Sequence, residues 1–300
     1  MVSCTFDDSL VFFPQKFNII SFKKFVFFIF AATFGALFVL SLNINNVKLI
    51  LTLLFFSILQ LTQAQDRLFT YAYQSTVLNK GQREIEIWNT LESGRDDFYR
   101  RLRHRVEYEV GLGSNIQTAF YLNIDQKFEQ PASIGFSNEW KWKLTDPVAN
   151  AVGTALYGEF TIKPHETEIE GKLLVDKQTG DFLHAFNFVI ERGWEKEFEG
   201  DEIESSSFTE SNFHYAFAYR VKPGFHLGIE SVLRNEWAPE REYTNLFAGP
   251  CFSFANENFW INGTFLPQLT SFYSADATSN GLDLVHHTKY EARVIFSFIL

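Results

Sequence analysis

The sequence predicts an all-β fold, a transmembrane antiparallel up-and-down β-barrel of about twelve strands. Beyond residue 80, apolar and polar residues alternate in runs of about ten residues or more, the length of a tilted strand that crosses a bilayer. Tight turns and wider loops alternate between these runs, as periplasmic turns and external loops do in outer-membrane barrels. The last run, residues 290–300, keeps an apolar residue at every second position up to Leu300.

A soluble β-sandwich would show the same alternation, with its apolar face as the core. The length of the runs, the alternation of connections and the apolar end of the chain favour the barrel. A closed barrel can also lie in lipid, because closure leaves no unpaired backbone edge.

Residues 47–64 have the form of a secretory signal peptide. Lys48 supplies the positive start, Leu49 to Leu61 form the apolar core, and small residues lead to a cleavage site between Ala64 and Gln65. The sequence therefore predicts export from the cytoplasm.

Residues 1–46 precede this signal and contain an apolar stretch, 25–42, that is long enough for a transmembrane helix. Met1 is the only methionine of the chain. We expect residues 1–46 to be an upstream extension from a mis-assigned start, with translation beginning at Val47. The alternative is a genuine N-terminal anchor.

The rest of the chain divides into residues 65–80, expected as a short segment on the periplasmic side, and the barrel, residues 81–300. Without residues 1–64 the chain keeps 22 basic and 34 acidic residues, a net charge of −12. This balance argues against a nucleic-acid partner. Cys251 is then the only cysteine, so a disulfide-rich secreted scaffold is excluded.

The alternating runs define twelve expected strands, an even number that returns both chain ends to one side of the membrane. They are 82–92, 99–112, 115–127, 134–144, 152–162, 167–176, 181–191, 207–221, 225–236, 243–254, 258–267 and 285–300. The widest loops are predicted at 192–206 and 268–284.

Aromatic residues are abundant, with 35 Phe, 11 Tyr and 6 Trp, more than a core of this size needs. We expect them on the lipid-facing surface, with girdles at the membrane interfaces. The predicted interface residues are Tyr99, Trp140, Trp142, Phe182, Phe225 and Phe259.

The last strand resembles the C-terminal signature that the barrel-assembly machinery of Gram-negative outer membranes reads. Its apolar residues are Tyr290, Val294, Phe296, Phe298 and Leu300. The signature usually closes on an aromatic residue, whereas this chain closes on Leu300.

The opposite faces of the strands carry charges of both signs and are expected to line the lumen. The candidate lining and selectivity residues are Glu84, Glu86, Arg101, Arg103, Arg105, Glu107, Glu109, Lys141, Lys143, Glu230, Arg234, Lys289, Glu291 and Arg293. The ladder Arg101/Arg103/Arg105 lies toward the external half, where the acidic ladder of the first strand could pair with it. Two interpretations stay open: a constriction whose field orients a solute, or a salt-bridged network that fills a narrow barrel.

Enzymatic chemistry has no clear signature. A lipid hydrolase would need a serine and a histidine with an orienting third residue, and no serine stands in a recognisable nucleophile motif. His286 and His287 are adjacent on a predicted strand and would point to opposite faces, which disfavours a shared metal site. We expect no catalytic residue, metal or cofactor.

Four segments, "REIEIWNTLESGRDDFYRRLRHRVEYEVGLGSNIQTAFYL", "KLTDPVANAVGTALYGEF", "LFAGPCFSF" and "FWINGTFLPQ", look like a family of uncharacterised bacterial outer-membrane β-barrel proteins. That family is distantly similar to the outer-membrane transport proteins grouped under the phenol-degradation MetA pathway. The resemblance covers most of residues 66–300 and implies a barrel and transport of small organic molecules. It rests on strand and turn patterns, so it transfers no functional residue.

The sequence thus predicts a protein of the bacterial outer membrane that is a channel or transporter for a small solute, with a mixed-charge lumen. The alternative is a plugged barrel with a structural or adhesive role through its external loops, and a lipid hydrolase is a third hypothesis. The expected partners are outer-membrane lipid, the barrel-assembly machinery and an unidentified solute.

Overall fold

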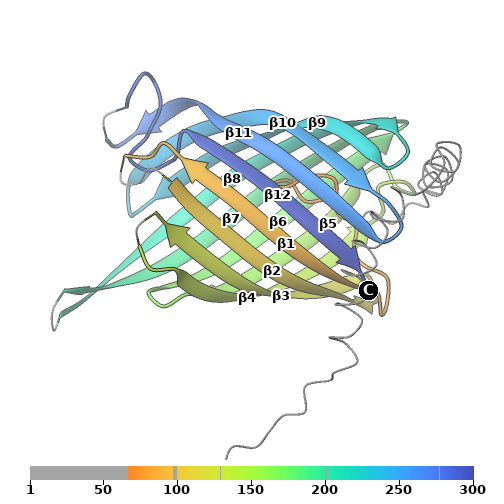
Figure 1. Cartoon of the computed structure of the whole chain (residues 1–300), viewed down its shortest axis with the longest axis horizontal. Helices are drawn as coiled ribbons and strands as arrows, with labels where there is room; N and C mark the ends of the chain where they lie inside the picture. The colour runs from red at the N-terminus through yellow and green to blue at the C-terminus, as the bar shows by residue number, and fades with distance from the viewer. Residues whose placement is uncertain (1–66, 97–99, 129, 200–201, 277) are drawn as a thin grey trace, which may run out of the picture. The chain divides into compact units, whose positions relative to one another are not determined.

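The computed structural model describes residues 67–96, 100–128, 130–199, 202–276 and 278–300. They form a closed antiparallel barrel (Figure 1), as the sequence predicts. Its twelve strands are β1 (Arg83–Ser93), β2 (Arg100–Gly113), β3 (Ile116–Lys127), β4 (Ser133–Thr145), β5 (Gly153–Ile162), β6 (Glu166–Thr179), β7 (Phe182–Glu199), β8 (Glu202–Lys222), β9 (Phe225–Trp237), β10 (Arg241–Ala255), β11 (Phe259–Ser274) and β12 (Tyr290–Ile299). Among these residues no helix is long and apolar enough to cross a membrane.

Each strand pairs with the next one along the chain, and β12 returns to pair with β1. In this closing pair Glu84 lies opposite Ile299 and Ser93 lies opposite Tyr290. Short turns such as 113–115 gather at one end of the barrel, the turn end, together with Leu300. The wider connections lie at the other end, the loop end.

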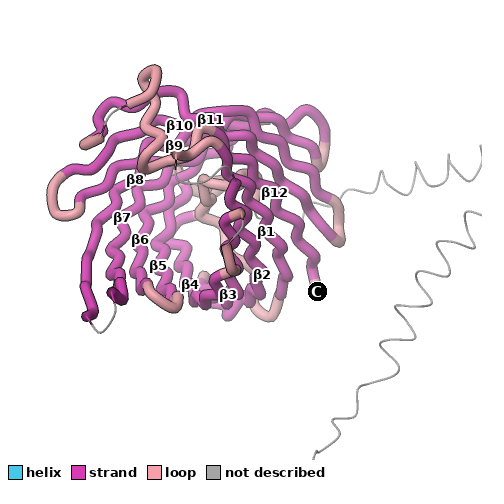
Figure 2. Tube along the Cα trace, turned by 60° about the vertical axis from the view of Figure 1, so that its left-hand side comes forward, coloured by secondary structure: helices cyan, strands magenta, loops and turns pink. Residues whose placement is uncertain are grey.

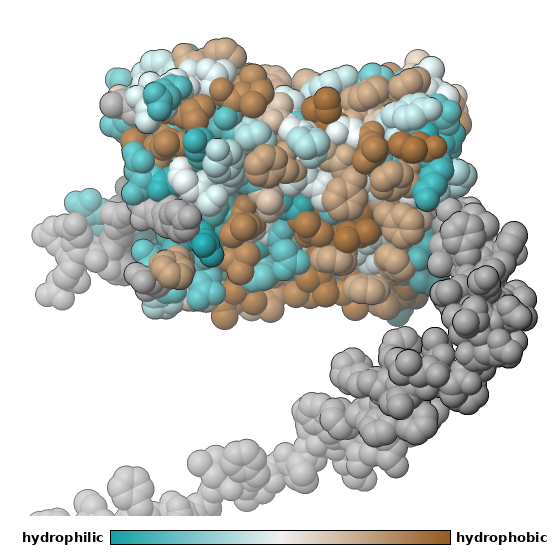
Figure 3. All heavy atoms as spheres, turned by 45° about the horizontal axis from the view of Figure 1, so that its top comes forward, coloured by the Kyte–Doolittle hydropathy of each residue, from teal (hydrophilic) through white to brown (hydrophobic). Residues whose placement is uncertain are grey.

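Alternation along each strand separates an apolar outer surface from a polar interior. Phe120, Phe136 and Ile229 point outward and are 57%, 64% and 56% exposed, while Glu107 and Glu139 point inward and are buried. Figure 3 shows apolar side chains over much of one face of the outer surface. A soluble protein would place these side chains inside, so the fold suits a lipid environment.

Most strand ends agree with the predicted ends to within three residues. The predicted loop 192–206 differs, because β7 and β8 continue to Glu199 and from Glu202 and form a hairpin that projects past the other strands (Figure 1). Here Lys196 lies opposite Ser205 and Glu195 opposite Ser206. The many charged residues of this segment suggested a loop. Backbone hydrogen bonds alone can hold a two-stranded hairpin, however, and a hairpin that projects from the barrel can expose both of its faces to water.

The connection between β11 and β12 also differs from the prediction. β11 continues to Ser274, and β12 begins at Tyr290, so residues 285–289 belong to the connection and not to a strand. The predicted loop 268–284 is therefore shifted toward the C-terminus.

The β2–β3 turn shows how the short turns arise. Ser114 and Asn115 have positive φ angles of 53° and 63°. Two successive residues with positive φ make a turn whose twist matches that of a β-hairpin. The tight turn predicted at residues 113–115 is thereby confirmed.

The N-terminal segment, residues 65–80, was predicted as a short segment on the periplasmic side, but its described part enters the barrel. From Arg67, the first described residue, to Leu78 the chain lies inside the barrel, and Phe69 and Thr70 are completely buried. Figure 2 shows this loop in the lumen. We call residues 67–80 the plug.

Candidate functional site: a plugged lumen

Glu230 of β9 holds the innermost part of the plug. Its carboxylate accepts hydrogen bonds from the backbone N–H groups of Thr70, Tyr71 and Ala72, at 2.8, 2.7 and 2.9 Å. Glu230 is completely buried. Three convergent N–H donors replace the water that the carboxylate would otherwise bind. In return, the carboxylate accepts hydrogen bonds from three backbone N–H groups that have no partner in a sheet.

Polar side chains of four other strands hold the rest of the plug. Asn187 of β7 accepts from the Tyr73 N–H at 2.6 Å and donates to the Tyr73 carbonyl at 2.8 Å. The remaining contacts are Ser75 N–H to Asp176 of β6 at 2.8 Å, Leu78 N–H to Gln117 of β3 at 2.9 Å, and Asn262 of β11 to the Arg67 carbonyl at 3.0 Å. The plug is therefore anchored around the circumference of the barrel.

Small residues on the wall make room for the aromatic side chain of Phe69. Ala216 and Ala218 of β8 face inward and share one buried apolar cluster with Phe69 and Cys251. Burying a phenylalanine stabilises a structure by about 1.5–3 kcal/mol. The plug is thus held by apolar packing as well as by hydrogen bonds.

Cationic side chains stack on the aromatic rings of the plug. The guanidinium carbon of Arg293 lies 4.0 Å from the centre of the Tyr71 ring, and the Lys172 ammonium lies 4.2 Å from that of Tyr73. Arg67, in the plug, lies over Tyr73 and over Trp88 of β1, at 3.9 and 4.3 Å. These contacts fill the space between plug and wall with attractive pairs.

One cavity between the plug and the wall has a volume of about 20 Å³, enough for about one water molecule. Its lining includes Tyr73 and Gln74 of the plug and Glu84, Glu86 and Glu109 of the wall. At this level the plug fills the lumen.

The arginine ladder of β2 lies nearer the loop end and is partly open to solvent. Arg101 donates to Asp125 at 2.7 Å and lies 3.8 Å from Glu92, and Arg103 also contacts Glu92. The Arg103 side chain is 41% exposed. Arg105, deeper in the barrel, lies 3.5 Å from Glu159 of β5. These ion pairs form a charged vestibule above the plug.

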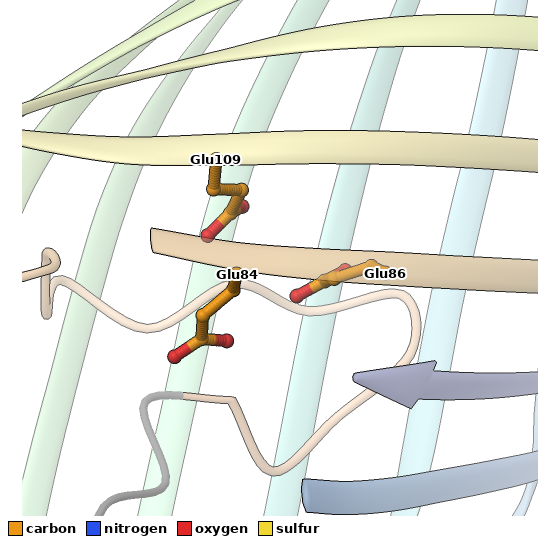
Figure 4. Close-up of side chains that lie close together, drawn as sticks. All are labelled: Glu84, Glu86 and Glu109. Atoms are coloured by element: carbon orange, nitrogen blue, oxygen red, sulfur yellow. The ribbon is translucent and has the colours of Figure 1, made fainter. Parts of the chain in front are cut away.

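The predicted pairing of this ladder with the first strand holds for Glu92 and is wrong for Glu84 and Glu86. In the β1–β2 register Glu84 lies opposite Glu109 and Glu86 opposite Glu107, so like charges face each other. Figure 4 shows Glu84, Glu86 and Glu109 close together on the lumenal side. Glu84 accepts from the Trp260 and Ser297 side chains at 3.2 and 3.0 Å, and Glu86 accepts from Trp88 at 2.7 Å.

The remaining lysines of the predicted lining, together with Glu291 and Arg293, occupy four different places. Lys141 is buried at the cavity, whereas Lys143 contacts Asp146 at 3.3 Å in the β4–β5 turn. Lys289 precedes β12 and lies 5.2 Å from the Tyr290 ring. Glu291 and Arg293 face the plug: Tyr71 donates to Glu291 at 3.0 Å, and Arg293 donates to the Thr70 carbonyl at 3.0 Å.

The predicted interface and assembly residues have surface positions where they are described. Trp140, Trp142 and Phe182 are 51%, 50% and 44% exposed, and Phe225 and Phe259 are half-buried. In β12 and just after it, Tyr290, Phe296, Phe298 and Leu300 are exposed and Val294 is half-buried. Tyr99 and the predicted cleavage residues Ala64 and Gln65 lie outside the described residues.

His286 and His287 lie in the β11–β12 connection and not on a strand, which corrects their predicted placement. The Nδ1 atom of His286 lies 2.9 Å from a carboxylate oxygen of the buried Asp283. His287 packs edge-on against the ring of Tyr243, with ring centres 4.4 Å apart, and its burial lowers its pKa to about 3. The connection therefore packs against the inner wall at the loop end.

Sequence reasoning missed the plug because residues 67–80 have neither strand nor helix periodicity. Their backbone partners lie far away along the chain, as with Thr70 and Glu230. A hint was available in the wall: inward-facing Asn187, Gln117 and Asn262 are uncharged amides that can pair with a backbone.

A closed antiparallel barrel with an apolar outer surface and a polar interior belongs to the class of outer-membrane β-barrels. The model of a family of unknown function, DUF6662, matches residues 61–300, and the chain belongs to that family. No match was found among curated protein sequences.

Solved structures with a similar fold include outer-membrane proteins. The COG4313 outer membrane channel from Pseudomonas putida F1 aligns with a TM-score of 0.51 and 8% identity, over 75% of this chain and 98% of that one. The NanC porin aligns with a TM-score of 0.49 and 10% identity, over 72% of this chain and 100% of that one. At such identities the likeness concerns the fold alone.

Proposed function

We propose that this protein is an outer-membrane channel for small polar solutes that is closed at rest by its own N-terminal segment. The supporting observation is that the wall groups holding the plug are polar. Glu230, Asn187, Asp176 and Gln117 would bind water equally well if the plug left. A barrel that is always filled could have an apolar interior like any protein core. The polar wall of this barrel could instead be hydrated if the plug left the lumen.

The vestibule would then make the first contact with a solute. Positive Arg101 and Arg103 lie beside negative Glu92 and Asp125, so a solute meets both signs of charge on three neighbouring strands. Opposite charges this close together favour a dipolar or zwitterionic solute over a simple anion or cation. The location in the outer membrane, reached by export and the barrel-assembly machinery, is part of the same proposal and is supported by the apolar outer surface.

A second function is favoured by the projecting hairpin of β7 and β8. It extends beyond the other strands and would offer a contact surface outside the membrane even if the plug never moved. In that case the barrel would serve as a rigid anchor for the hairpin.

The native thiol of Cys251 offers a direct test, because it packs in the same buried cluster as Phe69 of the plug. The full chain, with Cys4 replaced by serine, is purified in detergent and reconstituted in planar bilayers. Heat-dependent gel mobility serves as the control for folding. Single-channel conductance and the rate of Cys251 alkylation by a small maleimide are measured in parallel. We expect rare openings and slow alkylation in the parent protein.

Glu230→Ala removes the three plug anchors, so openings and alkylation should both increase. Glu168→Gln is the matched control, since Glu168 also faces the lumen but contacts Lys163, at 2.6 Å. Faster alkylation without any conductance would contradict the channel and favour the second function, in which the barrel only holds the projecting hairpin.

Replacing Arg101, Arg103 and Arg105 together by alanine should shift the ion selectivity of the Glu230→Ala channel toward cations. Unchanged selectivity would contradict the proposed role of these arginines.

A further inference from the structure

A group of buried carboxylates lies in the wall beside the plug. Glu107 and Glu109 of β2 and Glu139 of β4 each offer an oxygen atom, and these atoms lie within 4.8 Å of one another. The intervening strand β3 contributes Ala119, which lies opposite both Glu109 and Glu139. Its side chain is a single methyl group, so no large side chain of β3 stands at this position between the two carboxylates.

Two of these carboxylates have no hydrogen-bond donor. Both oxygens of Glu107 and both oxygens of Glu139 are without a partner, although their side chains are almost completely buried, at 0% and 1% exposed. A buried charge without a partner is strongly unfavourable, so such a group needs a cation, a proton or donors. This separates them from Glu84, Glu86 and Glu230, which all accept hydrogen bonds.

Three of the neighbouring cations contact other carboxylates. Arg105 lies 3.5 Å from Glu159, and Lys172 lies 2.9 Å from Glu170. Arg67 lies 4.0 Å from Glu86. Lys141, on the same face of β4 as Glu139, lines the small cavity next to Glu109.

Glu109 also belongs to a second group, with Glu84 and Glu86 of β1 (Figure 4), so two groups of three share one member. Like charges directly opposite each other on neighbouring strands destabilise a sheet. Glu109 is thus shared by both groups of carboxylates, and it lines the cavity.

We propose that Glu107, Glu109 and Glu139 form a binding site for a divalent cation of the Ca²⁺ type. Ca²⁺ binds oxygen ligands at 2.3–2.6 Å in a flexible geometry, so three carboxylate oxygens within 4.8 Å of one another can contact one ion. Mg²⁺ demands a near-ideal octahedron and usually keeps several waters, which a buried group of three carboxylates fits less well. The cavity at Glu109 has room for a water ligand. One ion would connect β2 to β4 across β3.

The proposal does not depend on solute passage, and it departs from the expectation of no metal site. The competing state is a pair of shared protons on the carboxylates, with no metal. Ca²⁺ binding measured at neutral pH distinguishes the two states. A metal site would bind the ion, whereas carboxylates that hold protons would not.

The experiment uses the full chain, purified in detergent, treated with a chelator and checked for folding by heat-dependent gel mobility. Equilibrium dialysis against ⁴⁵Ca²⁺ should give one ion per chain at pH 7.5, and added Ca²⁺ should raise the melting temperature. In E107Q/E139Q both effects should be lost. In E168Q, which changes a lumenal glutamate away from the group, both should remain.

If the double variant does not fold, E139Q alone is expected to weaken Ca²⁺ binding at least about tenfold, since affinity depends on the number of charged ligands. A folded parent protein that binds no ⁴⁵Ca²⁺ would overturn the proposal. Equal binding by the parent and a folded E107Q/E139Q protein would do the same.

Discussion

Arg234 of β9 donates two hydrogen bonds to Glu291 of β12, at 2.5 and 3.0 Å, although β10 and β11 lie between these strands in the sheet. The Tyr71 hydroxyl of the plug donates to the same carboxylate at 3.0 Å. The pair therefore spans part of the lumen and joins the wall to the innermost part of the plug.

Replacing Glu291 by glutamine should destabilise the barrel by about 3–5 kcal/mol, because it leaves the buried Arg234 without its counter-charge. Urea unfolding in lipid vesicles, followed by tryptophan fluorescence, measures this difference. The double variant Arg234→Met/Glu291→Leu should recover much of the loss, since neither member of the pair then remains as a buried charge. If Glu291→Gln were as stable as the parent protein, the pair would have no structural role.

Phe69→Ala should loosen the plug by leaving a cavity among Ala216, Ala218 and Cys251. Truncating a buried phenylalanine costs about 3–5 kcal/mol. We therefore expect faster alkylation of Cys251 in a Cys4→Ser background, with little change in the unfolding of the strands. Phe128→Ala is the control, because Phe128 is 62% exposed and follows β3 at the loop end. Equal alkylation rates in the two variants would show that the packing of Phe69 does not hold the plug in place.

Phe120→Arg should test the lipid-facing surface. Phe120 is 57% exposed near the middle of β3, and an arginine at the bilayer midplane costs about 2–4 kcal/mol. The loss should appear in urea unfolding from lipid vesicles. Tyr121→Phe, one residue further on the buried inner face, provides a matched conservative change and should have a smaller effect. An unchanged stability of Phe120→Arg would mean that this face does not contact lipid.

The strand order, the outer surface and most strand ends could be predicted from local sequence. Alternation assigns each residue to a face, and turn residues such as Ser114 and Asn115 mark where a hairpin reverses. The inward direction of Glu107 and Glu139 follows from the same alternation.

The lack of hydrogen-bond partners at Glu107 and Glu139 could not be predicted, because it depends on the register in which the strands pair. Glu86 meets Glu107 only because β1 and β2 pair with this offset, and a shift of the pairing would bring different residues together. The plug could not be predicted from local sequence for a related reason. Glu230 and Thr70 are 160 residues apart, and nothing near Thr70 indicates a lumenal carboxylate.

Asp283 should make the β11–β12 connection sensitive to acid. Burial would raise the pKa of this carboxyl, but hydrogen bonds from the His286 backbone N–H, at 3.0 Å, and the Asn245 side chain, at 3.1 Å, outweigh it, so the pKa lies below its ordinary value. Because the folded pKa is lower than the unfolded one, the carboxylate stabilises the connection above about pH 4 and loses this effect as the pH falls through the folded pKa.

Hydrogen exchange of residues 278–289, measured from pH 7 to pH 3 and corrected for the intrinsic rate, should therefore show opening only at the acidic end. Asp283→Asn should be open at every pH, because an amide cannot replace the carboxylate toward both donors and His286. His286→Gln should keep the acid opening, since the backbone N–H and Asn245 remain. An Asp283→Asn variant that follows the parent protein at every pH would show that this carboxylate does not hold the connection against the wall.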